Sequence, residues 1–112
     1  MLFRSFVDRV VAKTKALRQG DPLDPNVDVG AMTVPMQVDR VEEQLKRAVS
    51  EGARVLAGGR RLDRPGLFFQ PTVLGDVKPE HAIMREECFG PILPILPVAD
   101  DEIGRASCRE RV

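Results

Sequence analysis

The chain has 112 residues, of which 43% are hydrophobic and 30% charged, and its 17 basic residues balance 17 acidic ones. This size suits one small domain, and the even charge balance argues against nucleic acid or an anionic membrane as a partner. No apolar run approaches the roughly 20 residues of a membrane span, and two cysteines and one histidine give neither a disulfide framework nor a metal-site spacing. We therefore expect a soluble, cytoplasmic protein without a bound metal.

The sequences of the two ends of the chain differ in character from the sequence between them. Residues 103–112 resemble a translated sequencing adapter, and residues 1–5 resemble the matching adapter at the other end. We expect both segments to be non-native, so that Cys108 carries no evolved function and residues 6–102 are the genuine piece. The alternative is a basic C-terminal tail that binds an acidic partner.

The first predicted helix covers residues 6–19. Its apolar residues recur at steps of three and four, which is typical of an amphipathic helix. Gly20 is expected to end this helix in the left-handed conformation, and Asp21 and Pro22 prevent its continuation. The proline- and aspartate-rich residues 21–30 are expected to form an ordered loop.

The second helix, between Pro35 and Gly52, has the clearest pattern in the chain. Pro35 suits the first turn and Gly52 the C-terminal cap. One apolar stripe is predicted to face the core: Val38, Val41, Leu45, Ala48 and Val49. Two acid-before-base pairs four residues apart are predicted to add slight stability: Glu42–Lys46 and Glu43–Arg47.

The rest of the chain alternates short apolar runs with turns. Three runs predict strands: residues 54–57, 67–74 and 92–98. Gly58 and Gly59 form a turn after the first run, which we expect to be buried, and Pro71 is expected to bend the second strand or place it at an edge. Residues 75–85 are a loop or short helix. The third run is a buried strand or, alternatively, an extended proline-rich segment.

The most informative string is Glu86-Glu87-Cys88-Phe89-Gly90-Pro91. It resembles the Glu-Glu-x-Phe-Gly-Pro signature of the NAD(P)-dependent aldehyde dehydrogenase superfamily. Further matches fall in the family's order: Gly20–Pro22, Gly30, Glu51–Ala53, Gly58–Gly59 and Pro71–Leu74. The resemblance covers residues 6–102. It implies an α/β fold, part of a catalytic domain with helices packed on a mostly parallel sheet. The implied reaction oxidises an aldehyde to a carboxylic acid with NAD or NADP through a cysteine thioester.

The resemblance also implies roles for two residues of the signature. Glu87 would bind the two hydroxyls of the nicotinamide ribose, since an ionised carboxylate offers two acceptor oxygens to a vicinal diol. The alternative for Glu87 is a solvated or helix-capping carboxylate. Phe89 would pack near the nicotinamide, and its alternative is plain core packing. Gly90 and Pro91 are expected to form a backbone turn rather than a ligand contact.

A further implied contact lies at the start of the second helix. In many relatives a Gln and a basic residue three positions later approach the adenine-side ribose, and Gln37 and Arg40 fit that spacing. Residues three apart on a helix face the same way. The alternative is that both are solvated surface residues.

We predict no catalytic residue in this stretch. Cys88 adjoins carboxylates, whose negative charge disfavours the nucleophilic thiolate, so we interpret Cys88 as a small apolar residue. The family's nucleophile lies in a Gly-Gln-x-Cys context that this chain lacks. His81 is expected to be a loop residue.

The parent enzyme is then expected to be a homo-oligomer acting on a small aldehyde. Two other classes remain open. One is a stand-alone α/β binding module, in which both helix stripes would be covered internally. The other is a non-catalytic structural homologue.

Overall fold

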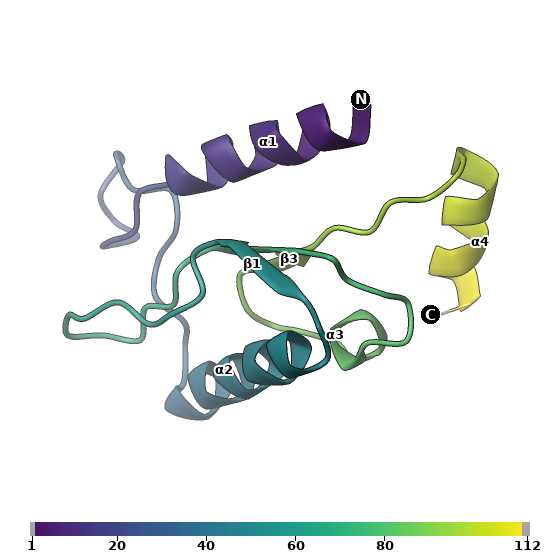
Figure 1. Cartoon of the computed structure of the whole chain (residues 1–112). Coiled ribbons are helices and arrows are strands. Elements are labelled where there is room, and N and C mark those ends of the chain that lie inside the picture. Colours follow the sequence, from purple (N-terminus) through teal and green to yellow (C-terminus); the bar gives the residue numbers. More distant parts are fainter. Residues whose placement is uncertain (1, 111–112) are drawn as a thin grey trace.

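The computed structural model describes residues 2–110, with the side chains of residues 2–105. The side chain of Cys108, about which a prediction was made, lies outside the described residues. Figure 1 shows the elements in chain order: α1 (Leu2–Lys15), α2 (Pro35–Ser50), β1 (Arg54–Ala57), β2 (Thr72–Gly75), α3 (Ala82–Arg85), β3 (Ile92–Pro94) and α4 (Asp101–Glu110). None of these helices is both long enough and apolar enough to cross a membrane.

The three strands form one sheet in the order β1-β2-β3. β2 pairs antiparallel with β1 and parallel with β3, where Thr72 lies opposite Ile92 and Leu74 opposite Pro94. The predicted α/β class is confirmed, with a small mixed sheet. Pro71 lies just before β2. The expected edge position is wrong, because β2 is the central strand, and the alternative of a bend at Pro71 stays a prediction.

Helices cover both faces of this sheet (Figure 1). On one face α2 and α3 enclose the larger core, to which β2 contributes Leu74. The other face carries a smaller core around Ala57, Val73 and Ile95, covered by half-buried valines of α1. Because successive strand residues point to opposite faces, β2 serves both cores.

The second helix follows the prediction closely. Pro35 occupies its first turn, and Gly52 follows the C-cap with φ of 115°. The amide of Ala53 donates to the carbonyl of Ala48, and that of Gly52 to the carbonyl of Val49, so the helix ends in a Schellman motif. Val49 is the exception in the predicted stripe, because it is 48% exposed.

The first helix differs from its prediction at both ends. It runs continuously from Leu2 and stops at Lys15 rather than Gln19. Gly20 does not have positive φ. It is buried where an added Cβ would lie 3.0 Å from Val27, so close packing explains the glycine. Beside it, the Gln19 side-chain amide donates to the carbonyl of Phe69 over 2.7 Å. The assignment of residues 1–5 as non-native stays a prediction.

Two strand predictions are met in part. β1 is an edge strand in which only Ala57 is buried, so the expected burial of the whole run is wrong. β3 covers three residues, after which the chain continues as the extended segment that was the alternative.

The helix α4 was not predicted. It follows that extended segment and lies to one side of the body (Figure 1). The Asp100 carboxylate accepts the amide of Ile103 over 2.9 Å, which is an N-terminal cap that the sequence could have revealed. The assignment of residues 103–112 as non-native also stays a prediction.

Candidate functional site

The signature segment leaves α3 and passes along α2 before entering β3. Glu86 ends α3 in an extended conformation, and Glu87 and Phe89 follow as exposed residues. At Gly90 the segment approaches α2 so closely that a Cβ would overlap the Val41 side chain. The amide of Ile92 donates back to the carbonyl of Gly90 over 2.9 Å, so the predicted turn is confirmed.

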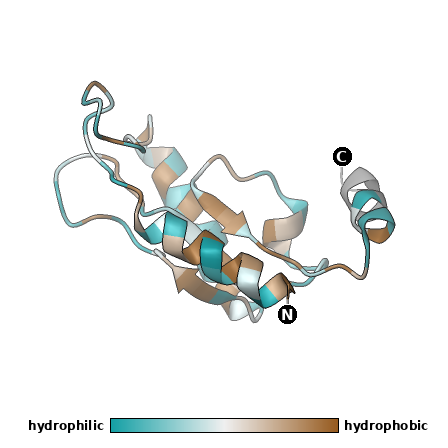
Figure 2. Cartoon of the chain, turned by 90° about the horizontal axis from the view of Figure 1, so that it is seen from above, coloured by the Kyte–Doolittle hydropathy of each residue, from teal (hydrophilic) through white to brown (hydrophobic). Residues whose placement is uncertain are grey.

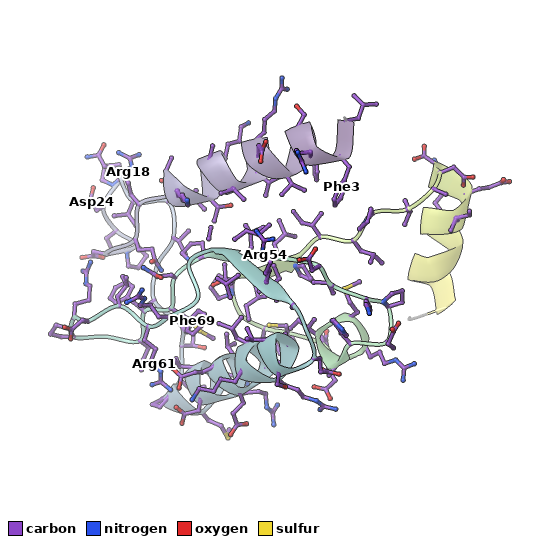
Figure 3. All side chains as sticks on the ribbon, viewed as in Figure 1. Phe3, Arg18, Asp24, Arg54, Arg61 and Phe69 are labelled. Carbon is purple, nitrogen blue, oxygen red and sulfur yellow. The ribbon has the colours of Figure 1, made fainter. Side chains whose placement is uncertain are left out.

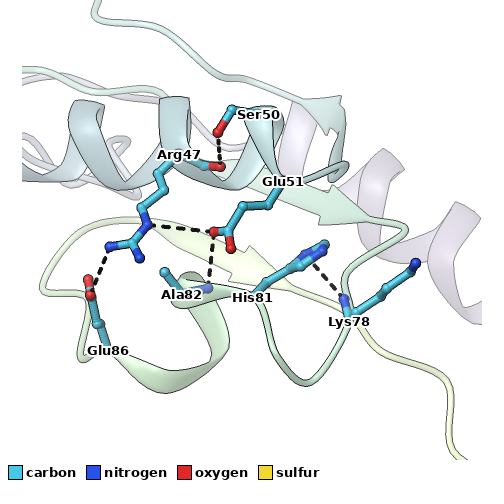
Figure 4. A network of polar contacts seen from close by, with 7 residues as sticks. All are labelled: Arg47, Ser50, Glu51, Lys78, His81, Ala82 and Glu86. Carbon is cyan, nitrogen blue, oxygen red and sulfur yellow. Dashed lines mark hydrogen bonds and ion pairs between the residues drawn. The ribbon is translucent and has the colours of Figure 1, made fainter.

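A polar network joins the end of α2 to α3 and to the signature segment (Figure 4). The Arg47 Nη1 atom lies 3.2 Å from Glu86 Oε1, and its Nε lies 3.8 Å from Glu51 Oε1. The same Glu51 oxygen accepts the amide of Ala82, the first residue of α3, over 3.1 Å. The predicted Glu42–Lys46 pair is confirmed at 3.6 Å. The predicted Glu43–Arg47 pair is wrong, because Arg47 reaches Glu51 and Glu86 instead.

A second contact fixes the main chain of the segment. The Gln44 Nε2 atom donates to the backbone carbonyl of Glu87 over 3.0 Å. The other side-chain atom, Gln44 Oε1, is buried and has no hydrogen-bond partner among the described residues. The contacts of Gln44 and Arg47 with the signature segment were not predicted from the sequence, because their partners lie 43 and 39 residues away.

These residues surround a surface hollow of about 420 Å³ between α2 and the signature segment. Its lining carries charges of both signs: Arg40, Glu43, Gln44, Arg47, Glu86 and Glu87. The fold thus brings Arg40 and Glu87 to one site. Gln37 lies half-buried one turn earlier on α2 and is outside this lining. Phe89 is also outside it and is 68% exposed, so plain core packing of Phe89 is wrong.

The start of α2 is braced by the polar connector of residues 60–66, whose contact with this helix was not predicted from the sequence. Figure 3 labels Arg61 beside this end of α2, and Phe69 between the helix and the sheet. The Arg61 guanidinium donates to Asp39 and, over 2.9 Å, to Glu42. These hydrogen bonds, that to Asp39 first, raise the pKa of Arg61 above its usual value. The loop therefore holds the turn of α2 that carries Gln37 and Arg40.

The sequence model of the aldehyde dehydrogenase family matches residues 1–105. The chain belongs to the aldehyde dehydrogenase family. It is 41% identical over 99 residues to the NADP(+) succinate-semialdehyde dehydrogenase 1 of Mycobacterium bovis, a match that covers 88% of this chain and 22% of that protein.

Solved aldehyde dehydrogenase structures share its fold. Lactaldehyde dehydrogenase from Escherichia coli matches with a TM-score of 0.89 and 36% identity, over 95% of this chain and 22% of the other. The NAD+ complex of the Bacillus cereus aldehyde dehydrogenase matches with a TM-score of 0.88 and 31% identity, over 93% of this chain and 21% of the other. The chain thus spans about a fifth of the length of these aldehyde dehydrogenases.

Within this aldehyde dehydrogenase stretch, Cys88 is packed as an apolar residue. It is a half-buried free thiol against the larger core, with its sulfur 4.0 Å from the carbonyl of Gly90. His81 is buried in a tight turn, where its Nδ1 accepts the amide of Lys78 over 3.2 Å (Figure 4). Both side chains are therefore engaged in local structure. Across the described part of the chain, no cluster of three or more His, Cys, Asp or Glu side chains could hold a metal ion.

Proposed function

We propose that this stretch binds the nicotinamide ribose of NAD+ or NADP+ in an enzyme that oxidises an aldehyde to a carboxylic acid. The observation that carries the proposal is the difference between two adjacent carboxylates. Glu86 is paired with Arg47. The Glu87 carboxylate lines the hollow and has no hydrogen bond or ion pair to any other described residue. A free carboxylate offers two acceptor oxygens to a vicinal diol.

The neighbouring residues fit a dinucleotide. Phe89 presents an exposed ring beside Glu87, and an aromatic ring can cover one face of a flat heterocycle. Arg40 shares the hollow with Glu87, and Gln37 precedes it by three residues on the same helix face. We assign this pair to the adenine-side ribose. When bound, the dinucleotide supplies the hydride acceptor for aldehyde oxidation.

Catalysis itself is assigned to residues other than these. Cys88 is engaged in packing, and no other cysteine side chain is described, so we propose that this stretch positions the cofactor and that the isolated chain does not turn over aldehydes. Thiol-dependent turnover of an aldehyde by the isolated chain, abolished by Cys88→Ser, would contradict this assignment. The small aldehyde substrate and homo-oligomeric assembly remain proposals for the complete enzyme.

The cofactor role is tested by two isosteric changes at adjacent positions. Residues 6–102 would replace the matched stretch of the Mycobacterium bovis relative, and the chimera would be compared with its Glu87→Gln and Glu86→Gln variants. A charge-assisted hydrogen bond contributes about 1.5–3 kcal/mol, so Glu87→Gln should slow hydride transfer roughly ten- to hundredfold. Glu86→Gln should have the smaller effect because Arg47 already occupies that carboxylate.

The measurements are pre-steady-state NADPH formation at saturating cofactor and the Tm of each protein. Glu87 is exposed, so its substitution should leave Tm nearly unchanged. An unchanged burst rate in Glu87→Gln, or a variant that only unfolds, would show that Glu87 is a structural carboxylate.

A further inference from the structure

Three residues of α2 hold the signature segment, and they are spaced three apart. Val41 packs under Gly90, Gln44 binds the main chain of Glu87, and Arg47 pairs with the side chain of Glu86. A spacing of three places them along one face of the helix. The segment is thus held at three successive points, while the Glu87 carboxylate has no described partner.

We propose that Gln44 and Arg47 are positioning residues that aim the Glu87 carboxylate at the bound ligand. Gln44 fixes the Glu87 main chain. Arg47 pairs with Glu86 within the lining of the hollow and so leaves Glu87 as the free carboxylate of the two. This inference rests on the proposed function, because it assigns the open carboxylate to the nicotinamide ribose. It adds two residues that the family signature does not contain.

The hydrogen bonding of Gln44 supports a positioning role. Its Nε2 donates to the Glu87 carbonyl over 3.0 Å, while its buried Oε1 has no partner among the described residues. An unsatisfied buried acceptor lowers stability, and an apolar side chain of similar size would avoid that cost. Stability alone therefore does not account for a glutamine here, whereas placement of the Glu87 main chain does.

The charges around Arg47 support the second half of the proposal. Its pairs with Glu86 and Glu51 join side chains that are between 31% and 60% exposed, so they add little to stability. They do decide which of two adjacent carboxylates is free. Without Arg47, three carboxylates would line the hollow against the single charge of Arg40. Glu86 could then compete with Glu87 for the same donors.

The first test uses the full chain with Gln44→Leu and, as a matched control, Lys46→Ala on the exposed side of the same helix. Backbone ¹⁵N order parameters and NADH titrations would be recorded by NMR. In Gln44→Leu the amides of residues 87–89 should become more mobile while the urea midpoint stays near that of the parent chain. The dissociation constant for NADH should rise about fivefold, equivalent to about 1 kcal/mol at 1.4 kcal/mol per tenfold. Lys46→Ala should change none of these quantities.

A second pair of variants separates hydrogen bonding from shape. Gln44→Glu is isosteric but only accepts, whereas Gln44→Lys retains a donor. Mobility of residues 87–89 should rise in the first and stay close to that of the parent chain in the second. Both variants change the local charge, so they are compared on order parameters and not on NADH affinity.

Arg47→Met tests the other contact. It should leave the order of Glu87 largely intact and weaken NADH binding, and the added change Glu86→Gln should restore binding by removing the competing carboxylate. A double variant that binds no better than Arg47→Met would overturn the role of Arg47.

The outcomes distinguish this inference from the proposed function. If NADH shifts the resonances of Glu87 and Phe89 in the parent chain, but Gln44→Leu changes neither order nor affinity, the positioning role is wrong and the cofactor role stands. If NADH shifts neither residue in the parent chain, the cofactor role fails for this chain. The order parameters of the three Gln44 variants still decide whether Gln44 fixes the segment.

Discussion

The two helices that cover the sheet are packed very differently. In α2 four residues of the apolar stripe are at most 5% exposed: Val38, Val41, Leu45 and Ala48. In α1 no residue is buried, Val7, Val10 and Val11 are half-buried, and Phe6 is 56% exposed. Seen from above in Figure 2, α1 lies across the sheet with hydrophilic and hydrophobic residues on its visible face.

This difference in burial shows that α2, and not α1, can hold a ligand-binding segment in a fixed position. The signature segment rests on α2, whose buried stripe fixes the helix relative to the sheet. By contrast, α1 covers its face loosely. If the chain were a stand-alone binding module, the apolar stripes of both helices would be covered by the rest of the chain. The stripe of α1 is not fully covered. Four predictions follow from the contrast, in order of decreasing effect.

The largest effect is expected from truncating the α2 stripe. Leu45→Ala should lower the free energy of unfolding by about 2–5 kcal/mol, because it leaves a cavity in the larger core. Val10→Ala in α1 should cost less than about 1 kcal/mol, since the valine is only half-buried. Urea unfolding of both variants measures the difference. Equal losses would show that α1 is packed as firmly as α2.

The contact between Gly90 and α2 should be the next most sensitive. A methyl group at Gly90 would overlap Val41, so Gly90→Ala should cost about 1–3 kcal/mol as overpacking. Val41→Ala makes room for that methyl group. The double variant should therefore be more stable than the sum of the two single losses predicts. Strict additivity in a double-mutant cycle would show that the two residues do not touch.

The cap of α2 should be less sensitive, because only the backbone is strained there. Gly52 has φ of 115°, and an added Cβ would meet no atom within 4 Å. Gly52→Ala should therefore cost about 1–2 kcal/mol from left-handed backbone strain alone. Thermal unfolding measures the loss, with Ser50→Ala in the preceding turn as the control. A loss no greater than that of the control would mean that the cap can rearrange without cost.

The smallest effect is expected in the exposed loop after α1. The pKa of Asp28 is lowered from its usual value of 3.8, first by the backbone amide of Arg18 and then by its side chain. Because the folded value is depressed, the stabilisation is present above the unfolded pKa and is lost as pH falls through the folded one. Asp28→Asn should remove this dependence. The pKa of Asp28 in the parent chain is measured from its carboxyl ¹³C shift as a function of pH. A titration midpoint at or above 3.8 would contradict the prediction.

The sequence located the candidate site better than it described how the site is held. Glu87 and Arg40 were both predicted, and they line one hollow. The exposure of Phe89 excludes core packing, but its approach to nicotinamide stays a prediction, as do the ribose contacts of Gln37 and Arg40. Gln44 could not be found in advance, since its donor role depends on a carbonyl 43 residues away.

What the sequence determined by itself is local. The stripe and Schellman cap of α2 and the packed role of Cys88 follow from spacing, backbone freedom and side-chain type. The predicted turn at Gly58 and Gly59 is wrong, because antiparallel pairing continues past both glycines to a bridge between Arg61 and Phe69. The tertiary structure alone decided where those elements meet. It placed β2 at the centre of the sheet, exposed Val49, and gave Gly20 a packing role in place of a cap. It also turned Arg47 from Glu43 toward Glu86, because an exposed side chain pairs with whichever carboxylate the fold brings within reach, and sequence spacing does not encode that approach.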